Sequence, residues 1–228
     1  MRKLFTALAL VSAVVAGAAG CASSGRSRTE TTVTGLNDLR KDGDEGKKSI
    51  QATVNALTAL EKSEGRGLAA SYEKFVTEFG TLESLASRAR DHGQAMRDRG
   101  SDYFKSWEEQ IGTMANPDIK KRSEERRTAL ETLYTAMTTS MTSCRQQYDK
   151  FSADLTDIKQ ALDLDLTPNG VKNLAEPIAK ARDDADALDT SIDDVLAKLE
   201  GLAKELNSIQ GAGEGPKTEG AAASGSKT

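Results

Sequence analysis

The strongest constraint on this chain is a repeat of apolar and small side chains at alternating spacings of four and three residues between residues 68 and 162. In the first half of this stretch the repeat comprises Leu68, Tyr72, Phe75, Phe79, Leu82, Ala86, Ala89, Gly93, Met96, Gly100, Tyr103 and Trp107. In the second half it comprises Ile119, Ser123, Arg126, Leu130, Leu133, Met137, Met141, Cys144, Tyr148, Phe151, Leu155, Ile158 and Leu162. Such spacing is typical of the contact positions of a coiled coil. Because Asn116-Pro117-Asp118 interrupts the repeat, the stretch predicts two long helices that fold back antiparallel as a hairpin.

A shorter amphipathic segment precedes the hairpin. Its contact positions are Val33, Leu36, Leu39, Ile50, Val54, Leu57 and Leu60. Between its two halves, Gly43 and Gly46 occupy positions where contact residues are due, and each costs a helix about 1 kcal/mol relative to alanine. The run 41–48 therefore predicts a frayed or kinked helix. Its acidic residues lack the twelve-residue ligand spacing of a calcium loop, so no calcium site is expected.

Local signals mark the other helix boundaries. Gly65 and Gly67 form a glycine-rich corner before the hairpin, as expected just after a helix ends. Thr167 followed by Pro168 suits an N-cap with proline at the first helical position. The last amphipathic segment has contact positions Val171, Leu174, Ile178, Ala181, Ala185, Leu188, Ile192, Val195, Leu199, Leu202, Leu206 and Ile209. Pro177 must either kink this helix or mark its true start.

These segments predict an all-α fold, an elongated antiparallel coiled coil or four-helix bundle of residues 33–210 built on the long hairpin. The first and last helices are shorter than the hairpin, so they should cover its lower half and leave residues 100–127 without cover. We expect residues 21–32 to form a flexible tether and residues 211–228 a disordered tail, since neither has large apolar side chains to bury. The oligomeric state stays open, because the contact stripes can be shared between chains or covered within one.

Composition excludes several functional classes. Hydrophobic residues make up 37% and aromatics 4%, which is thin for an α/β enzyme core and suits helices that bury one narrow stripe. The mixture of 31 basic and 35 acidic residues argues against nucleic-acid binding. With His92 as the only histidine and two cysteines, neither a Cys/His metal site nor a disulfide framework is expected.

No catalytic or cofactor fingerprint occurs in the sequence, so an enzyme is not expected, nor a cofactor. His92 is expected to be a polar residue beside the contact stripe rather than a base. Cys144 occupies a contact position, where a thiol packs as a small apolar group. A reactive or interchain-disulfide role for Cys144 is the alternative.

The first twenty residues have the composition of an export signal. Met1-Arg2-Lys3 is followed by an apolar run that ends in Ala18-Ala19-Gly20-Cys21. This arrangement resembles a bacterial lipoprotein signal peptide (residues 1–20), although such signals usually carry an aliphatic residue where Ala18 stands. The resemblance implies a lipid on Cys21 and, because Ala22 replaces the usual inner-membrane retention aspartate, an outer-membrane location facing the periplasm. The alternatives are ordinary secretion, with Cys21 incidental, and an uncleaved anchor.

The end of the hairpin, here called the hairpin tip (residues 103–127), has the most unusual composition. It carries the only tryptophan together with a dense cluster of charges. The residues that we expect to form an interaction surface are Tyr103, Phe104, Trp107, Asn116, Pro117, Lys120, Arg122, Arg126 and Arg127. On the simpler interpretation, Trp107 fills the gap near the corner and the charges form solvated pairs along the helix faces.

Three runs of the chain resemble an uncharacterised family of bacterial envelope proteins, a domain of unknown function that is expected to be helical. They are Tyr103-Phe104-Lys105-Ser106-Trp107-Glu108-Glu109, residues 116–127 and residues 165–171. The resemblance covers roughly residues 35–205 and implies no activity. We therefore expect a lipid-anchored helical protein of the periplasm with a structural or protein-interaction role. It would be attached to the membrane through its N-terminal lipid and would contact an envelope protein at the hairpin tip. A second hypothesis is that it regulates an envelope enzyme or transporter through this contact. A carrier of a small ligand or lipid is the alternative.

Overall fold

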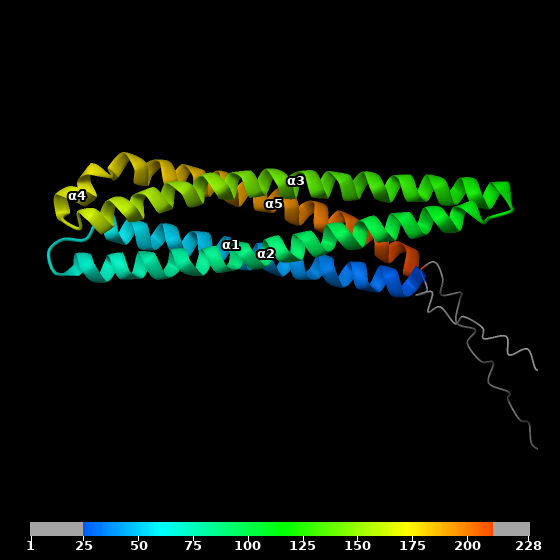
Figure 1. Cartoon of the computed structure of the whole chain (residues 1–228), viewed down its shortest axis with the longest axis horizontal. Helices are drawn as coiled ribbons and strands as arrows, with labels where there is room; N and C mark the ends of the chain where they lie inside the picture. Colours follow the sequence, from blue (N-terminus) through cyan, green and yellow to red (C-terminus); the bar gives the residue numbers. More distant parts are fainter. Residues whose placement is uncertain (1–24, 212–228) are drawn as a thin grey trace, which may run out of the picture.

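The computed structural model describes residues 25–211, with side chains from Glu30 to Asn207, as a rod of helices (Figure 1). The helices are α1 (Gly25–Glu61), α2 (Gly67–Gly112), α3 (Pro117–Leu164), the short α4 (Pro168–Asn173) and α5 (Ala175–Gly211). The four long helices run antiparallel to their chain neighbours along the rod, which confirms the predicted all-α bundle. The signal peptide, Cys21 and residues 212–228 lie outside the described residues.

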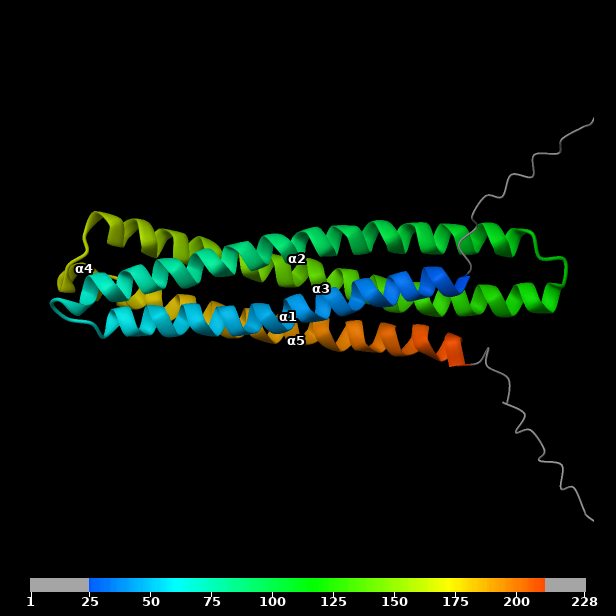
Figure 2. The same ribbon diagram turned by 90° about the horizontal axis from the view of Figure 1, so that it is seen from below.

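The closest helix pairs are α1 with α2 and α3 with α5, and α1 also packs along α5. The two arms of the hairpin, α2 and α3, contact each other less than either contacts its other neighbour (Figure 2). The hairpin is therefore not an independent two-helix coiled coil. The apolar repeat of α2 is shared between α1 and α3, and that of α3 mainly between α5 and α2.

The corners follow the local signals. The side chain of Asn116 accepts hydrogen bonds from the backbone N–H groups of Asp118 at 3.0 Å and Ile119 at 3.2 Å, with Pro117 at the first helical position. Thr167 caps α4 in the same way by accepting from the Gly170 N–H at 3.1 Å. Gly65 has a φ of 56°, the left-handed conformation that glycine adopts without strain. These predicted boundaries are confirmed.

Pro177 lies in the first turn of α5, after a break at Leu174 that separates α5 from α4. The backbone N–H groups of a first helical turn have no partner within the helix, so a proline there loses no hydrogen bond. Pro177 therefore marks the start of the helix and does not kink it.

Two predictions about the N-terminal segment were wrong. Residues 25–32, expected to belong to the tether, form the first turns of α1, and Thr32 is buried. The run 41–48, expected to be frayed or kinked, is continuous α-helix. Its Gly43 packs against α5, where an added Cβ would come within 2.8 Å of the Leu196 side chain. The close approach of α5 compensates for the poor helix propensity of the glycine.

The interior contains two clusters of buried side chains. The corner cluster, near Gly65, includes Leu57, Leu60, Phe75, Phe79 and Phe151. The tip cluster, toward Asn116, includes Leu36, Met96, Phe104, Leu130 and Leu206. Because the tip cluster contains residues of α1 and α5, these helices reach farther along the hairpin than the predicted lower half, and that prediction was wrong.

Candidate functional site

The aromatic residues of the hairpin tip lie together but are largely packed. Phe104 is buried, with 8% of its surface exposed, and its ring meets that of Tyr134 edge-on at 5.4 Å between centroids. Tyr103 and Trp107 are half-buried and also meet edge-on, at 5.7 Å. The indole N–H of Trp107 donates to the Ser123 hydroxyl at 2.9 Å. For these rings the structure agrees with the simpler interpretation, in which they fill the space between α2 and α3.

The arginines of the tip are mostly engaged within the bundle. Arg126 forms an ion pair with Glu205 and donates to the Glu205 backbone oxygen at 2.9 Å. Arg127 pairs with Glu108 at 3.2 Å and with Glu131 at 3.6 Å. The polar contact positions Ser123 and Arg126 therefore have partners within the bundle.

The free surface of the tip is smaller than predicted and lies closer to the corner. Asn116 and Pro117 form the helix cap, Lys120 is half-buried and Arg122 is exposed. The large apolar residue that does face solvent is Ile119, with 56% of its surface exposed. Sequence reasoning had assigned Ile119 to the contact stripe. Its position two residues after Pro117, in the first turn beyond the corner, was the available signal that nothing would cover it.

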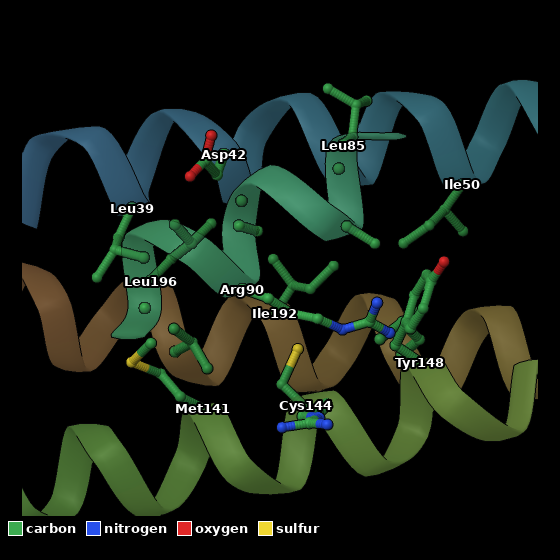
Figure 3. Close-up of a pocket in the computed structure, with 18 of the residues that line it drawn as sticks. Leu39, Asp42, Ile50, Leu85, Arg90, Met141, Cys144, Tyr148, Ile192 and Leu196 are labelled. Carbon is green, nitrogen blue, oxygen red and sulfur yellow. The ribbon is translucent and has the colours of Figure 1, made fainter. Parts of the chain in front are cut away.

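A second candidate site, which the sequence did not indicate, is a cavity of about 180 Å³ at the junction of the two clusters. Figure 3 shows side chains around it from four helices: Leu39 and Ile50 from α1, Arg90 from α2, Met141, Cys144 and Tyr148 from α3, and Ile192 and Leu196 from α5. The lining is predominantly apolar, and we call this space the mid-bundle cavity.

Small residues create the mid-bundle cavity. Gly46, Ala86 and Ala89 line it with side chains smaller than the leucine or isoleucine that would fill the interior, and Gly43 and Gly93 also line it. Gly43 and Gly93 bring helices close together, since a Cβ at Gly93 would lie 2.9 Å from the Met141 methyl. At Gly46, by contrast, a Cβ would meet no atom within 4 Å.

One wall of the cavity carries a buried carboxylate. Asp42, whose side chain is only 4% exposed, accepts from Arg88 Nε at 2.9 Å and lies 2.6 Å from His92 Nδ1. Arg88 also pairs with Glu45, and this hydrogen bond holds the pKa of Glu45 below its usual value. His92 is thus a partner of a buried acid, not merely a residue beside the stripe. These four side chains join α1 to α2, and the partners of the Asp42 carboxylate are Arg88 and His92.

The opposite wall, between α2 and α3, is rich in arginine. Arg90 spans the two helices by pairing with Asp149 at 3.0 Å, and its guanidinium carbon lies 5.0 Å from the centroid of the Tyr148 ring. Arg145 pairs with the other oxygen of the same carboxylate at 3.7 Å. Arg97 donates to the side-chain oxygen of Gln94 at 2.8 Å rather than to a carboxylate. We call Arg90, Arg97 and Arg145 the arginine rim.

Cys144 is half-buried in the cavity wall, and burial raises the pKa of its thiol above the usual value. A thiol in this environment stays protonated near neutral pH and is a weak nucleophile. Over residues 25–211, no three His, Cys, Asp or Glu side chains are grouped so that they could hold a metal ion. In the same range, no helix is both long and apolar enough to cross a bilayer.

Comparison with known proteins found one similarity. Neither the curated proteins nor the solved structures include a match to this chain. The family model described as "Protein of unknown function (DUF2959)" matches residues 20–207, which is most of the chain and includes the whole region of the predicted resemblance. The chain therefore belongs to the DUF2959 family.

Proposed function

We propose that this protein is a lipid-anchored helical bundle of the bacterial periplasm with a structural or protein-interaction role, and that the end of the α2–α3 hairpin contacts an envelope protein. The observation that carries the proposal is the projection of this end beyond both α1 and α5 (Figure 1). Ile119 lies there, exposed and next to the basic residues Lys120, Lys121 and Arg122. An exposed apolar residue rimmed by charges suits a protein contact.

One contact shows how far α5 reaches along the hairpin: Glu205 of α5 pairs with Arg126 of α3. From Arg126, α3 extends back to Pro117, roughly 14 Å at 1.5 Å per residue. The corner around Asn116 and the adjoining ends of α2 and α3 lie beyond the end of α5 (Figure 1).

The anchor decides the orientation of that surface. Cys21, the expected lipid-bearing residue, precedes the start of α1 at Gly25 by four residues, a span of at most about 14 Å. The first residues of α1 lie at the same end of the rod as the hairpin tip (Figure 2). Anchoring through Cys21 would therefore hold the tip close to the membrane surface. A partner within or beside the membrane fits this orientation better than one at a distance.

Site-specific crosslinking tests the contact. A photoreactive amino acid at Ile119 should give an adduct with a specific envelope protein, identified by mass spectrometry. The same probe at Glu83, an exposed position on α2, should give none. Equal yields from both positions would refute an interaction at the hairpin end.

The anchor requires a separate test. Mass spectrometry of the protein from the envelope fraction should find acyl chains on an N-terminal Cys21, and the Cys21→Ser variant should leave that fraction. An unmodified N-terminus beginning at another residue would contradict the anchor without affecting the crosslinking result.

A further inference from the structure

We infer that the mid-bundle cavity binds a small anionic amphiphile, a molecule with one anionic group on an apolar portion of about six to eight carbons. This inference is independent of the proposed contact at the hairpin end, from which the cavity is separated by the tip cluster. Three features of the described residues carry it: the size of the cavity, the chemistry of its walls and the charge at the arginine rim.

The size limits the apolar portion. An engineered apolar cavity of roughly 150 Å³ binds a molecule as large as benzene. The mid-bundle cavity, at about 180 Å³, therefore accepts a group of comparable or slightly greater size. It is too small for the two acyl chains of a phospholipid. Apolar contacts come from three different helices, through Leu39 and Ile50 of α1, Met141 of α3 and Ile192 of α5 (Figure 3).

The walls determine the charge of the ligand. On the α1 side the carboxylate of Asp42 is already paired with Arg88 and His92, so it does not call for a cationic ligand. On the α2–α3 side Arg90 and Arg145 share the carboxylate of Asp149, and Arg97 donates to the side-chain oxygen of Gln94. The carboxylates of Glu83 and Asp98 also lie on this side. Arginine side chains bind carboxylates and phosphates through paired hydrogen bonds. An anionic group at this rim would give Arg97 a charged partner in place of the Gln94 amide oxygen.

The two hairpin arms provide the entrance. They contact each other less than they contact α1 and α5, so the boundary between α2 and α3 is the least tightly packed one beside the cavity. Arg90 crosses this boundary to Asp149 and stacks near Tyr148. A ligand entering here would place its apolar portion inside and keep its anionic group among the arginines.

Calorimetric titration with octanoate tests the inference, using the full chain in lipid nanodiscs with protein-free nanodiscs as the blank. Octanoate should bind saturably with one site per chain, and octanol should bind at least fivefold more weakly. Arg97→Gln should weaken octanoate binding about fivefold and leave octanol binding unchanged. Arg66→Gln, at the exposed corner far from the cavity, is the matched control and should change neither.

Filling the cavity provides the second arm. Gly46→Leu adds a side chain where a Cβ meets no atom, so it should abolish octanoate binding while the protein remains folded by circular dichroism. Gly80→Leu, at an open position on α2 that does not line the cavity, should bind octanoate as the wild type does. No saturable octanoate binding, or unchanged binding by a folded Gly46→Leu variant, would overturn the inference. Octanol binding as tight as that of octanoate would refute the role of the arginine rim.

Discussion

The contribution of the buried Asp42 carboxylate to stability can be tested by replacing it with alanine. Asp42 lies on α1, and both partners of its carboxylate, Arg88 and His92, lie on α2. The Asp42→Ala variant deprives these two groups of their carboxylate and removes a polar link between the helices. Alanine favours a helix more than aspartate does, so any loss of stability must come from the lost contacts.

The expected magnitude follows from exposure. Removing one partner of a fully buried ion pair costs about 3–5 kcal/mol, whereas exposed pairs contribute about 0–1 kcal/mol. The Asp42 side chain is 4% exposed, but those of Arg88 and His92 are 43% and 40% exposed, so water can solvate them once the carboxylate is gone. We therefore expect a loss of about 1–3 kcal/mol in the free energy of unfolding. For a chain of this size that lowers the melting temperature by roughly 2–12 °C.

Urea and thermal unfolding followed by circular dichroism measure the effect. Asp44→Ala is the matched control, because Asp44 lies two residues farther along α1, is exposed and undergoes the same substitution. It should leave stability unchanged or slightly raised. If Asp42→Ala and Asp44→Ala unfold at the same urea concentration, the buried carboxylate contributes nothing and the reasoning from burial is wrong.

Two further predictions concern packing and titration. Gly100→Ala should lower the free energy of unfolding by about 1–3 kcal/mol, because the added Cβ would lie 2.3 Å from the Tyr134 ring. Gly80→Ala, which has open space around it, should raise the free energy of unfolding by up to about 1 kcal/mol. Urea unfolding of both variants checks these opposite signs, and a gain in stability for Gly100→Ala would contradict the packing. Partial burial, aided by a hydrogen bond to Asp163, raises the pKa of Tyr72 from 10.0 to about 12. Because the fold favours the protonated phenol, its stabilising effect is complete below about pH 10 and is lost as the pH rises through 12. Tyr72→Phe should remove that part of the alkaline loss of stability, as measured by urea unfolding between pH 9 and pH 12; an unchanged pH profile would contradict the shift.

The helices and their boundaries could be predicted from the sequence because both depend on neighbours along the chain. The spacing of apolar residues defines one face of each helix. Caps such as Asn116 and Thr167 act on backbone N–H groups two or three residues away. Such interactions are local, so the order and extent of most helices in the described part followed from residue types alone.

The choice of neighbours did not follow in the same way. An apolar stripe states that a helix buries one face but not which helix covers it. The contact between Gly43 and Leu196, which keeps α1 continuous, joins residues far apart in the sequence. The pair Arg126–Glu205 shows in the same way how far α5 reaches along the hairpin. Neither contact leaves a pattern in a single sequence.

The mid-bundle cavity shows most clearly the difference between what the sequence predicts and what the packing of helices decides. Gly46, Ala86 and Ala89 each read as a weak position in an otherwise regular repeat, because the sequence records side-chain size only one helix at a time. Only the packing of α1, α2, α3 and α5 brings these small residues to the same level, where together they leave a space of about 180 Å³. The sequence by itself determined the long helices and their turns, through interactions over one or two helical turns. The tertiary structure decided which small residues face one another, and so where the protein has room for a ligand.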